Sequence, residues 1–204
     1  MAGNYAVIVE GLRELREVEH LRDEILFNAV RAINRTADTG RTQAARQILQ
    51  QINFPASYLN PAQKRLWVSR RAQRGTLEAR ITARARPTSL ARFVSGNAAG
   101  GQGLRVEVKP GSTRFLRRAF LVKLRAGSAG IDTKFNMGLA VRLQPGDDLR
   151  NKKSVVKMAR GLYLLYGPSV DQVFLDNSGD GVASDIAPDL ADKLAEEFLR
   201  LMEL

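Results

Sequence analysis

The chain has 204 residues, 44% of them apolar, which is enough for one domain or two small ones with a buried core. It has no cysteine and one histidine, His20, so disulfide scaffolds, thiolate nucleophiles, cysteine-ligated metals and histidine-rich metal sites are excluded. The formal net charge of +11 makes a polyanionic partner the first hypothesis. No stretch approaches the roughly 18 apolar residues of a membrane span, so we expect a soluble, unexported chain. No cofactor is expected.

The positive charge is unevenly distributed along the sequence. Residues 1–60 hold seven Lys or Arg and seven Asp or Glu, whereas residues 61–125 hold sixteen basic residues against Glu78 and Glu107, a local balance of +14. Residues 126–204 hold nine basic and twelve acidic residues. Segments of unlike charge favour an assembly component that meets different neighbours, or a DNA-facing band, over an enzyme for a small substrate.

Two helices are predicted in the first third of the chain. From Leu12 to Ile52 apolar residues recur every three or four positions, which predicts a long amphipathic helix over residues 11–52. Gly40 costs about 1 kcal/mol relative to alanine inside a helix, so a bend is allowed there. Asn60 and Pro61 have the residue types of an N-cap and a first helical position, and they predict a short helix over residues 60–74.

Four strands are predicted in a basic sheet region over residues 76–144. Apolar and polar residues alternate from Leu77 to Arg86, as in a half-buried strand, and Pro87 ends the alternation. The same alternation marks residues 104–109, 120–125 and 139–143. Residues 95–103 are rich in glycine and predict a flexible connection, and loops are expected over residues 126–137 and 144–157.

The last segment, residues 161–204, is predicted to form a turn followed by a C-terminal helix. Leu190, Leu194 and Leu201 mark one helix face, and Pro188 suits the first turn of that helix. Because there is no βαβ alternation and no internal repeat, we predict a single α+β domain over residues 1–204. In it, the long N-terminal helix and the C-terminal helix pack on one face of an antiparallel sheet of about four strands, which leaves the other face for water or a partner.

The first predicted strand carries a row of arginines. Arg80, Arg84 and Arg86 would project from one face, with Arg80 and Arg84 about 13 Å apart. Such a row can bridge several phosphates or carboxylates, but a solvated strand face has the same pattern. A solvated face, a protein interface and direct DNA contact all remain open. Arg117 and Arg118, before the third strand, are further candidates for a DNA-facing or subunit-interface surface.

Two aromatic residues, Trp67 and Phe115, lie among basic residues. Aromatic side chains in basic surroundings are typical of platforms on which single-stranded bases stack. Because aromatic residues make up only 6% of the chain, we expect both side chains to pack in the core instead.

Other motifs are interpreted as structural. Asp176–Gly181 imitates the start of a calcium loop, but Ala187 stands where the bidentate glutamate is needed, so a polar turn is expected. The glycine-rich run lacks the lysine and hydroxyl residue of a phosphate-binding loop. His20 is expected on the surface of the first helix. No catalytic, cofactor-binding or metal-binding residue is predicted.

Gly167, Pro168 and Ser169 form a candidate structural turn. They follow an aromatic stretch over residues 161–166, and Ser169 and Gln172 have the spacing of a capping box. The turn is therefore expected to set the direction of the segment that follows it.

Several segments, in their order along the chain, carry a resemblance to a known protein family. They are Ala32-Ile33-Asn34-Arg35-Thr36-Ala37 with its continuation to Ile48, the basic first strand, Ala119-Phe120, and the turn Leu165-Tyr166-Gly167-Pro168-Ser169-Val170 with Phe174 and a final helix. In this order and spacing the chain, from about Gly11 onward, resembles the minor tail protein Z family of tailed bacteriophages, which are tail completion proteins of the lambda type. It departs from the family in the glycine-rich insertion near residue 100 and in the loop of residues 126–137.

The resemblance implies a non-enzymatic structural virion protein at the neck, the head-proximal end of the tail. It implies a homo-oligomeric ring, expected to be hexameric, between a tail terminator or tail tube protein and the head connector protein. The ring would assemble in the host cytoplasm without a membrane, and packaged double-stranded DNA would pass through it or stop near it. A ring closed by unlike contacts needs two complementary patches on each subunit, and the basic middle and acidic C-terminal segments would supply them.

A second hypothesis is a stand-alone, sequence-independent nucleic-acid-binding protein. It is motivated by the balance of +14 over residues 61–125. Binding through that charge would depend steeply on salt, since each neutralised phosphate releases counterions.

Overall fold

A computed structural model describes residues 6–8, 23–96, 103–124, 137–144, 154–158, 161–176 and 181–202, with only the backbone described for residues 6–8. The chain forms two compact units. The first, here called the helical unit, comprises Met1–Ile48, Ser57–Ala85 and Val170–Leu204. The second, the sheet unit, comprises Leu49–Ala56 and Arg86–Ser169. Residues 11–22 of the predicted first helix, including His20, lie outside the described residues.

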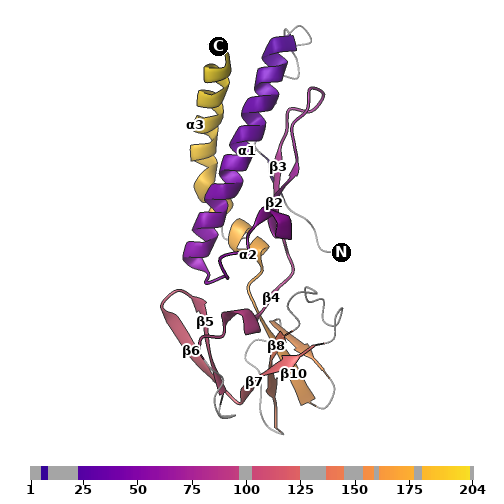
Figure 1. Cartoon of the computed structure of the whole chain (residues 1–204), viewed down its shortest axis with the longest axis vertical. Helices are drawn as coiled ribbons and strands as arrows, with labels where there is room; N and C mark the ends of the chain where they lie inside the picture. The colour runs from indigo at the N-terminus through magenta and orange to yellow at the C-terminus, as the bar shows by residue number, and fades with distance from the viewer. Residues whose placement is uncertain are drawn as a thin grey trace. The chain divides into compact units, whose positions relative to one another are not determined.

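The helical unit is organised by two long helices that lie side by side (Figure 1). Helix α1 spans Asp23–Gln51 and helix α3 spans Val182–Met202. They run antiparallel, because Asn28 near the start of α1 donates a hydrogen bond from Nδ2 to the carbonyl oxygen of Leu201 at 2.8 Å. Further along, Gln43 of α1 donates to the carboxylate of Asp189 at 2.8 Å.

The face that α1 buries is built from small residues and isoleucines. The buried positions recur with helical spacing and are Asn28, Ala29, Ala32, Ile33, Thr36, Ala37, Gly40, Ala44 and Ile48. Gly40 makes the closest approach possible, since a Cβ atom at this position would lie 2.6 Å from Leu190 Cδ1 and 3.3 Å from Ile81 Cδ1. The helix is continuous through Gly40, so the glycine serves packing and not helix termination.

A small antiparallel sheet belongs to the same unit. Its strands are β1 (Ala6–Ile8), β3 (Arg80–Ala83) and β2 (Leu66–Arg70), in the order β1-β3-β2. In the register of β2 and β3, Leu66 faces Ala83 and Val68 faces Ile81. These apolar pairs place one face of the sheet in the core, since cross-strand neighbours share a face.

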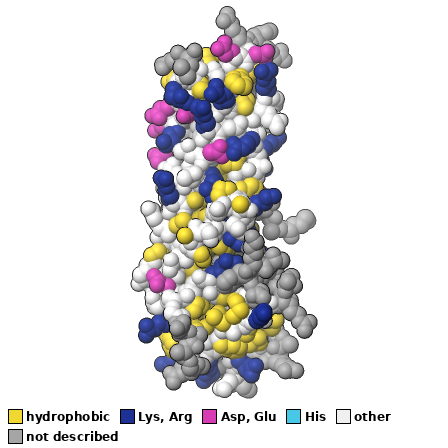
Figure 2. Space-filling model, viewed as in Figure 1, with side chains coloured by type: hydrophobic (Ala, Val, Ile, Leu, Met, Phe, Trp, Pro, Cys, Tyr) yellow, Lys and Arg dark blue, Asp and Glu magenta, His cyan; other side chains and the backbone are white. Residues whose placement is uncertain are grey.

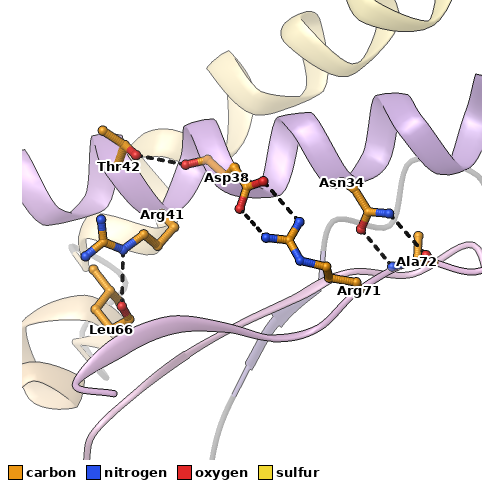
Figure 3. A network of polar contacts seen from close by, with 7 residues as sticks. All are labelled: Asn34, Asp38, Arg41, Thr42, Leu66, Arg71 and Ala72. Carbon is orange, nitrogen blue, oxygen red and sulfur yellow. Dashed lines mark hydrogen bonds and ion pairs between the residues drawn. The ribbon is translucent and has the colours of Figure 1, made fainter. Parts of the chain in front are cut away.

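Polar contacts tie the end of β2 to α1 (Figure 3). Asn34 donates from Nδ2 to the carbonyl oxygen of Ala72 at 3.1 Å and accepts from the Ala72 main-chain nitrogen at 2.9 Å. One turn along α1, Arg71 forms a two-point contact with Asp38 at 3.0 and 2.8 Å. The reciprocal amide pair fixes the register of the strand against the helix, since it satisfies both backbone groups of one residue.

The short helix predicted over residues 60–74 is wrong beyond its first turn. Asn60 caps a 3₁₀ turn, Pro61–Gln63, by accepting from Ala62 N at 3.1 Å, as its residue type suggested. Lys64 then adopts a left-handed conformation with φ 47°, and the chain continues as β2. The residues of β2 include Trp67 and Val68, whose bulky side chains favour a strand paired with β3 over a helix.

The C-terminal helix begins earlier than predicted, and a short helix precedes it. Helix α2 spans Val170–Leu175, directly after Ser169. Pro188 lies inside α3 and not in its first turn. A proline at this point removes one main-chain donor, which the packing of Val182 and Ile186, both fully buried, outweighs.

The sheet unit contains an antiparallel sheet and a separate two-stranded ribbon. The sheet has the order β4-β10-β8-β7, and its strands are β4 (Thr88–Ser89), β10 (Leu162–Gly167), β8 (Met137–Arg142) and β7 (Ala119–Lys123). Strand β9 (Val155–Lys157) also pairs with β10. The ribbon pairs β5 (Gly103–Lys109) with β6 (Ser112–Arg117).

The core of the sheet unit is made where these strands and a second 3₁₀ turn, Leu90–Phe93, meet. Leu124, Ala140 and Leu164 form one buried cluster. Phe93 packs against Phe54 with ring centroids 5.5 Å apart. The segment Leu49–Ala56 therefore belongs to this core, although its first three residues are the end of α1.

The predicted α+β fold is confirmed: the N-terminal helix α1 packs against the C-terminal helix α3, and the chain has an antiparallel four-strand sheet in addition to small sheets. The four-strand sheet belongs to the sheet unit, whereas both helices share their unit with the three-strand sheet. The four predicted strands exist as β3, β5, β7 and β8, although they are divided among three sheets. The alternation of apolar and polar residues indicates that one face of a strand is buried, but it does not indicate which strand pairs with it. Strand β9 falls in the predicted loop over residues 144–157, and residues 97–102, 125–136 and 145–153 lie outside the described residues.

The chain leaves the helical unit after Ala85 and returns to it at Val170. The points of exit and return are neighbours within the helical unit, since the main-chain nitrogen of Asp171 donates to the carbonyl oxygen of Arg84 at 3.2 Å.

Candidate functional site

The predicted row of Arg80, Arg84 and Arg86 is not formed. Strand β3 ends at Ala83, so only Arg80 lies in it, and Arg86 belongs to the sheet unit. Arg80 is half-buried and donates to the carboxylate of Glu78 at 3.2 Å. Thr82, two residues after Arg80, is buried and hydrogen-bonds Ser69 through the two hydroxyls at 2.6 Å. The sequence alternation extends beyond the strand itself, which ends at Ala83; after it the Arg84 main-chain nitrogen donates one further bond, to the Arg65 carbonyl oxygen at 2.9 Å.

Arg117 and Arg118 are both exposed in the sheet unit, but they do different things. Arg117 is the last residue of β6 and faces Gly103 of β5. Arg118 has φ 59° and forms the sharp connection between β6 and β7. Arg117 therefore projects from the ribbon, whereas Arg118 occupies a conformation that few residues other than glycine and asparagine adopt.

The outward face of the β5–β6 ribbon carries an exposed aromatic residue between basic residues. Arg105 of β5 faces Phe115 of β6, and Arg117 lies two residues further along β6, on the same face as Phe115. The Phe115 side chain is 53% exposed, so the expectation that it packs in the core is wrong. Trp67 is half-buried in β2, as a side chain at the edge of the core.

The opposite face of the ribbon borders a groove within the sheet unit, with a volume of about 450 Å³. Its apolar lining comes from β5, β6, β9, β10 and Leu90, and its polar lining comprises Lys109, Ser112, Arg114, Ser154 and Tyr166. Partial burial raises the pKa of the Tyr166 phenol, and the positive charge of Arg86 acts in the opposite direction. The phenol is therefore neutral at physiological pH.

Gly167, Pro168 and Ser169 form a tightly packed junction. Gly167 is the last residue of β10 and faces Thr88 of β4. A Cβ atom at Gly167 would lie 3.0 Å from Leu90 Cδ2 and 3.3 Å from Phe93 Cε2, so glycine lets the 3₁₀ turn approach the strand. Ser169 is fully buried and directly precedes α2. These contacts hold β10 against the 3₁₀ turn immediately before α2.

The two units carry very different net charges. The helical unit contains sixteen Lys or Arg and seventeen Asp or Glu, a balance of −1, whereas the sheet unit contains sixteen and four, a balance of +12. Figure 2 shows basic and acidic side chains next to each other over the helices of the helical unit. The whole excess of positive charge therefore belongs to the sheet unit.

Helix α3 presents an acidic stripe, defined here as Asp185, Asp192 and Glu196. These residues are exposed, and their spacing of seven and four places them on one side of the helix. Within the described part of the chain, no Lys or Arg nitrogen lies within 4 Å of their carboxylates. By contrast, Glu197, on the flank, bonds Arg35 and Arg200 at 3.2 and 2.8 Å, and these contacts lower the pKa of its carboxyl. The stripe is thus available to a basic partner.

The partly buried carboxyl group of Asp171 in α2 predicts how the stability of the fold depends on pH. Its Oδ1 atom is buried and makes no hydrogen bond in the described structure, and burial raises the pKa of the carboxyl. A group with a raised folded-state pKa stabilises the fold below its unfolded pKa, and that contribution is lost as the pH rises through the folded pKa. We expect Asp171→Asn to raise Tm at pH 7 and to leave Tm nearly unchanged at pH 3. Thermal unfolding at both pH values measures this, and a lower Tm at pH 7 would contradict it.

Neither a metal site nor a membrane span is found in the described part of the chain. No group of three or more His, Asp or Glu residues there is placed to hold a metal ion. No described helix is long and apolar enough to cross a bilayer. Residues 177–180 of the calcium-like motif lie outside the described residues.

Comparison with known proteins gives no match: no family model, no curated protein and no solved structure is significantly similar to this chain. Its function is therefore inferred from its own residues and their arrangement.

Proposed function

We propose that this chain is a non-enzymatic structural virion protein that completes the head-proximal end of a phage tail. In this proposal it forms a homo-oligomeric ring in the neck, between a tail terminator or tail tube protein and the head connector protein. Packaged double-stranded DNA runs through the ring or ends beside it. The order of motifs from the Ala-Ile-Asn-Arg helix to the Gly-Pro-Ser turn supports the phage assignment.

The observation that carries the proposal is the separation of charge between the units. A closed ring with identical contacts needs two different, complementary surfaces on each subunit. The sheet unit, at +12, offers the basic surface, and the acidic stripe of α3 offers its complement in a unit of net charge −1. An enzyme for a small substrate does not require one unit to carry the whole excess of positive charge.

The assembly is tested by reversing one charge of the stripe. Asp192→Lys is expected to raise the dissociation constant for self-association at least tenfold, because it places a like charge against the basic surface. Glu24→Lys is the matched control, since Glu24 is also exposed on a helix of the same unit and the charge change is the same. Sedimentation velocity over a range of protein concentrations and salt measures both variants.

Two outcomes would contradict the proposal. One is a wild-type chain that stays monomeric at high concentration and low salt. The other is cryo-electron microscopy of purified particles in which the neck lacks this chain. If Asp192→Lys self-associates as strongly as the wild type, the subunit contact does not involve the acidic stripe, and the assigned surface is wrong.

The alternative function is a stand-alone, sequence-independent nucleic-acid-binding protein, which the charge of the sheet unit favours. It predicts that log K for duplex DNA falls by about 0.9 per neutralised phosphate for each tenfold rise in salt. Weak duplex binding at low salt would exclude this alternative and leave the assembly role intact.

A further inference from the structure

The face of the β5–β6 ribbon that points away from the groove combines an exposed aromatic ring with two arginines. Leu104 and Val106 turn to the buried side, so Arg105 and its cross-strand neighbour Phe115 turn outward together. Arg117 follows Phe115 on the same side. We call Arg105, Phe115 and Arg117 the ribbon face.

The aromatic ring of this face has a defined position although it is exposed. A Cβ atom at Gly103 would lie 2.9 Å from Phe115 Cζ, so the ring reaches diagonally across the ribbon onto the bare backbone of Gly103. Gly103 has φ 137°, a conformation that other residues rarely adopt. A glycine thus supplies the space for the ring, while 53% of the side chain stays accessible to a partner.

The charge around the ring is not neutralised within the described part of the unit. No carboxylate there lies within 4 Å of Arg105 or Arg117, and both guanidinium groups are on exposed residues. Glu107 is the acidic residue of the ribbon, and its carboxylate instead accepts from the Gly111 main-chain nitrogen at 2.9 Å and from the Thr113 hydroxyl at 3.4 Å. It stabilises the hairpin turn and leaves the two arginines to an outside anion.

We propose that the ribbon face binds a single strand of nucleic acid, with a base stacked on Phe115 and phosphates held by Arg105 and Arg117. The combination of an exposed ring and flanking cations matches what an unpaired base and its backbone offer. An acidic protein segment would satisfy the arginines but presents no flat group to the ring. Paired bases in a duplex are already stacked on one another and present no free face to it. This inference does not rest on the assembly role.

Binding is tested with the full chain and a fluorescently labelled fifteen-nucleotide oligothymidine, by fluorescence anisotropy across a salt series. Phe115→Ala is expected to weaken binding at least tenfold with an unchanged salt slope, because it removes stacking and no charge. Arg105→Ala combined with Arg117→Ala is expected to reduce the slope of log K against log salt by about 1.4, or about 0.7 per phosphate of a single strand. Phe115→Tyr is expected to retain binding.

The helical unit supplies a matched control. Phe27 is 50% exposed, and the guanidinium carbon of Arg31 lies 5.5 Å from its ring centroid, so Phe27→Ala removes a similar ring beside a similar cation. It is expected to leave oligothymidine binding unchanged. Thermal unfolding is measured for every variant to check that the fold is kept. Because both rings are exposed, we expect Tm to change little.

Three results would overturn the proposal. Phe115→Ala that binds like the wild type would show that no base stacks there. Duplex DNA of the same length bound as tightly as oligothymidine would show attraction to the backbone alone. Polyglutamate that competes as well as oligothymidine would make the ribbon face a contact for acidic protein. None of these results bears on whether the chain is part of the virus particle, which is tested separately.

Discussion

Replacing Ile33 by aspartate is expected to lower the free energy of unfolding by more than about 4 kcal/mol. Ile33 is completely buried between α1, α3 and the strands, in a cluster with Ala79, Leu194 and Leu201. The substitution removes the apolar contacts of the side chain and places a carboxylate where the cluster offers it no partner. Urea denaturation followed by circular dichroism measures the difference.

Ile25 provides the control for this prediction. It lies on the same helix but is only half-buried, so its aspartate variant can turn the charge toward water. We expect a loss of less than half that of the Ile33 variant. Equal losses at the two positions would mean that the buried face of α1 is assigned wrongly.

The second large effect is expected at Gly40, which lies against Leu190 of α3 and Ile81 of β3. Gly40→Val would place its Cβ 2.6 Å from one methyl carbon of Leu190 and would add two more carbons beyond it. Leu190 is 2% exposed and has little room to move. We expect a loss of about 3 kcal/mol, the upper end for overpacking, in spite of the better helix propensity of the new residue.

A graded series separates the clash from the change of residue type. Gly40→Ala is expected to fall between the wild type and Gly40→Val, since its smaller side chain meets the same leucine. Gly75→Ala is the control, because a Cβ atom there meets nothing within 4 Å. A Gly40→Val variant as stable as the wild type would rule out the close packing of the two helices.

The parts of the fold that follow from local periodicity could be predicted from the sequence. The helical stripe through Ala29, Ile33, Ala44 and Ile48 is buried, because a spacing of three and four residues puts side chains on one face whatever lies opposite. The strands over residues 104–109 and 139–143 were found in the same way. What the pattern does not encode is the partner of each strand, and the strands are therefore distributed among sheets in a way that no alternation reveals.

The failures have a common physical cause, which is that tertiary contacts outweigh local preference. A proline after asparagine begins a helix only if the following residues continue it, and Leu66, Trp67 and Val68 gain more by pairing with β3. The arginine row failed because strand β3 ends at Ala83 and Arg86 already belongs to the sheet unit. Phe115 was assigned to the core from its residue type alone. The sequence signal for its actual position is Gly103, whose missing side chain leaves room for the ring to cross the ribbon.

The neighbouring exit and return points at Arg84 and Asp171 make residues 86–169 an insertion whose two ends are held together by the helical unit. Material joined in this way can change in length and charge with little effect on the host, since its ends already meet. The module that carries the positive charge can therefore change in length and charge while α1, α3 and their small sheet keep the same packing, as long as its core still accepts Leu49–Ala56.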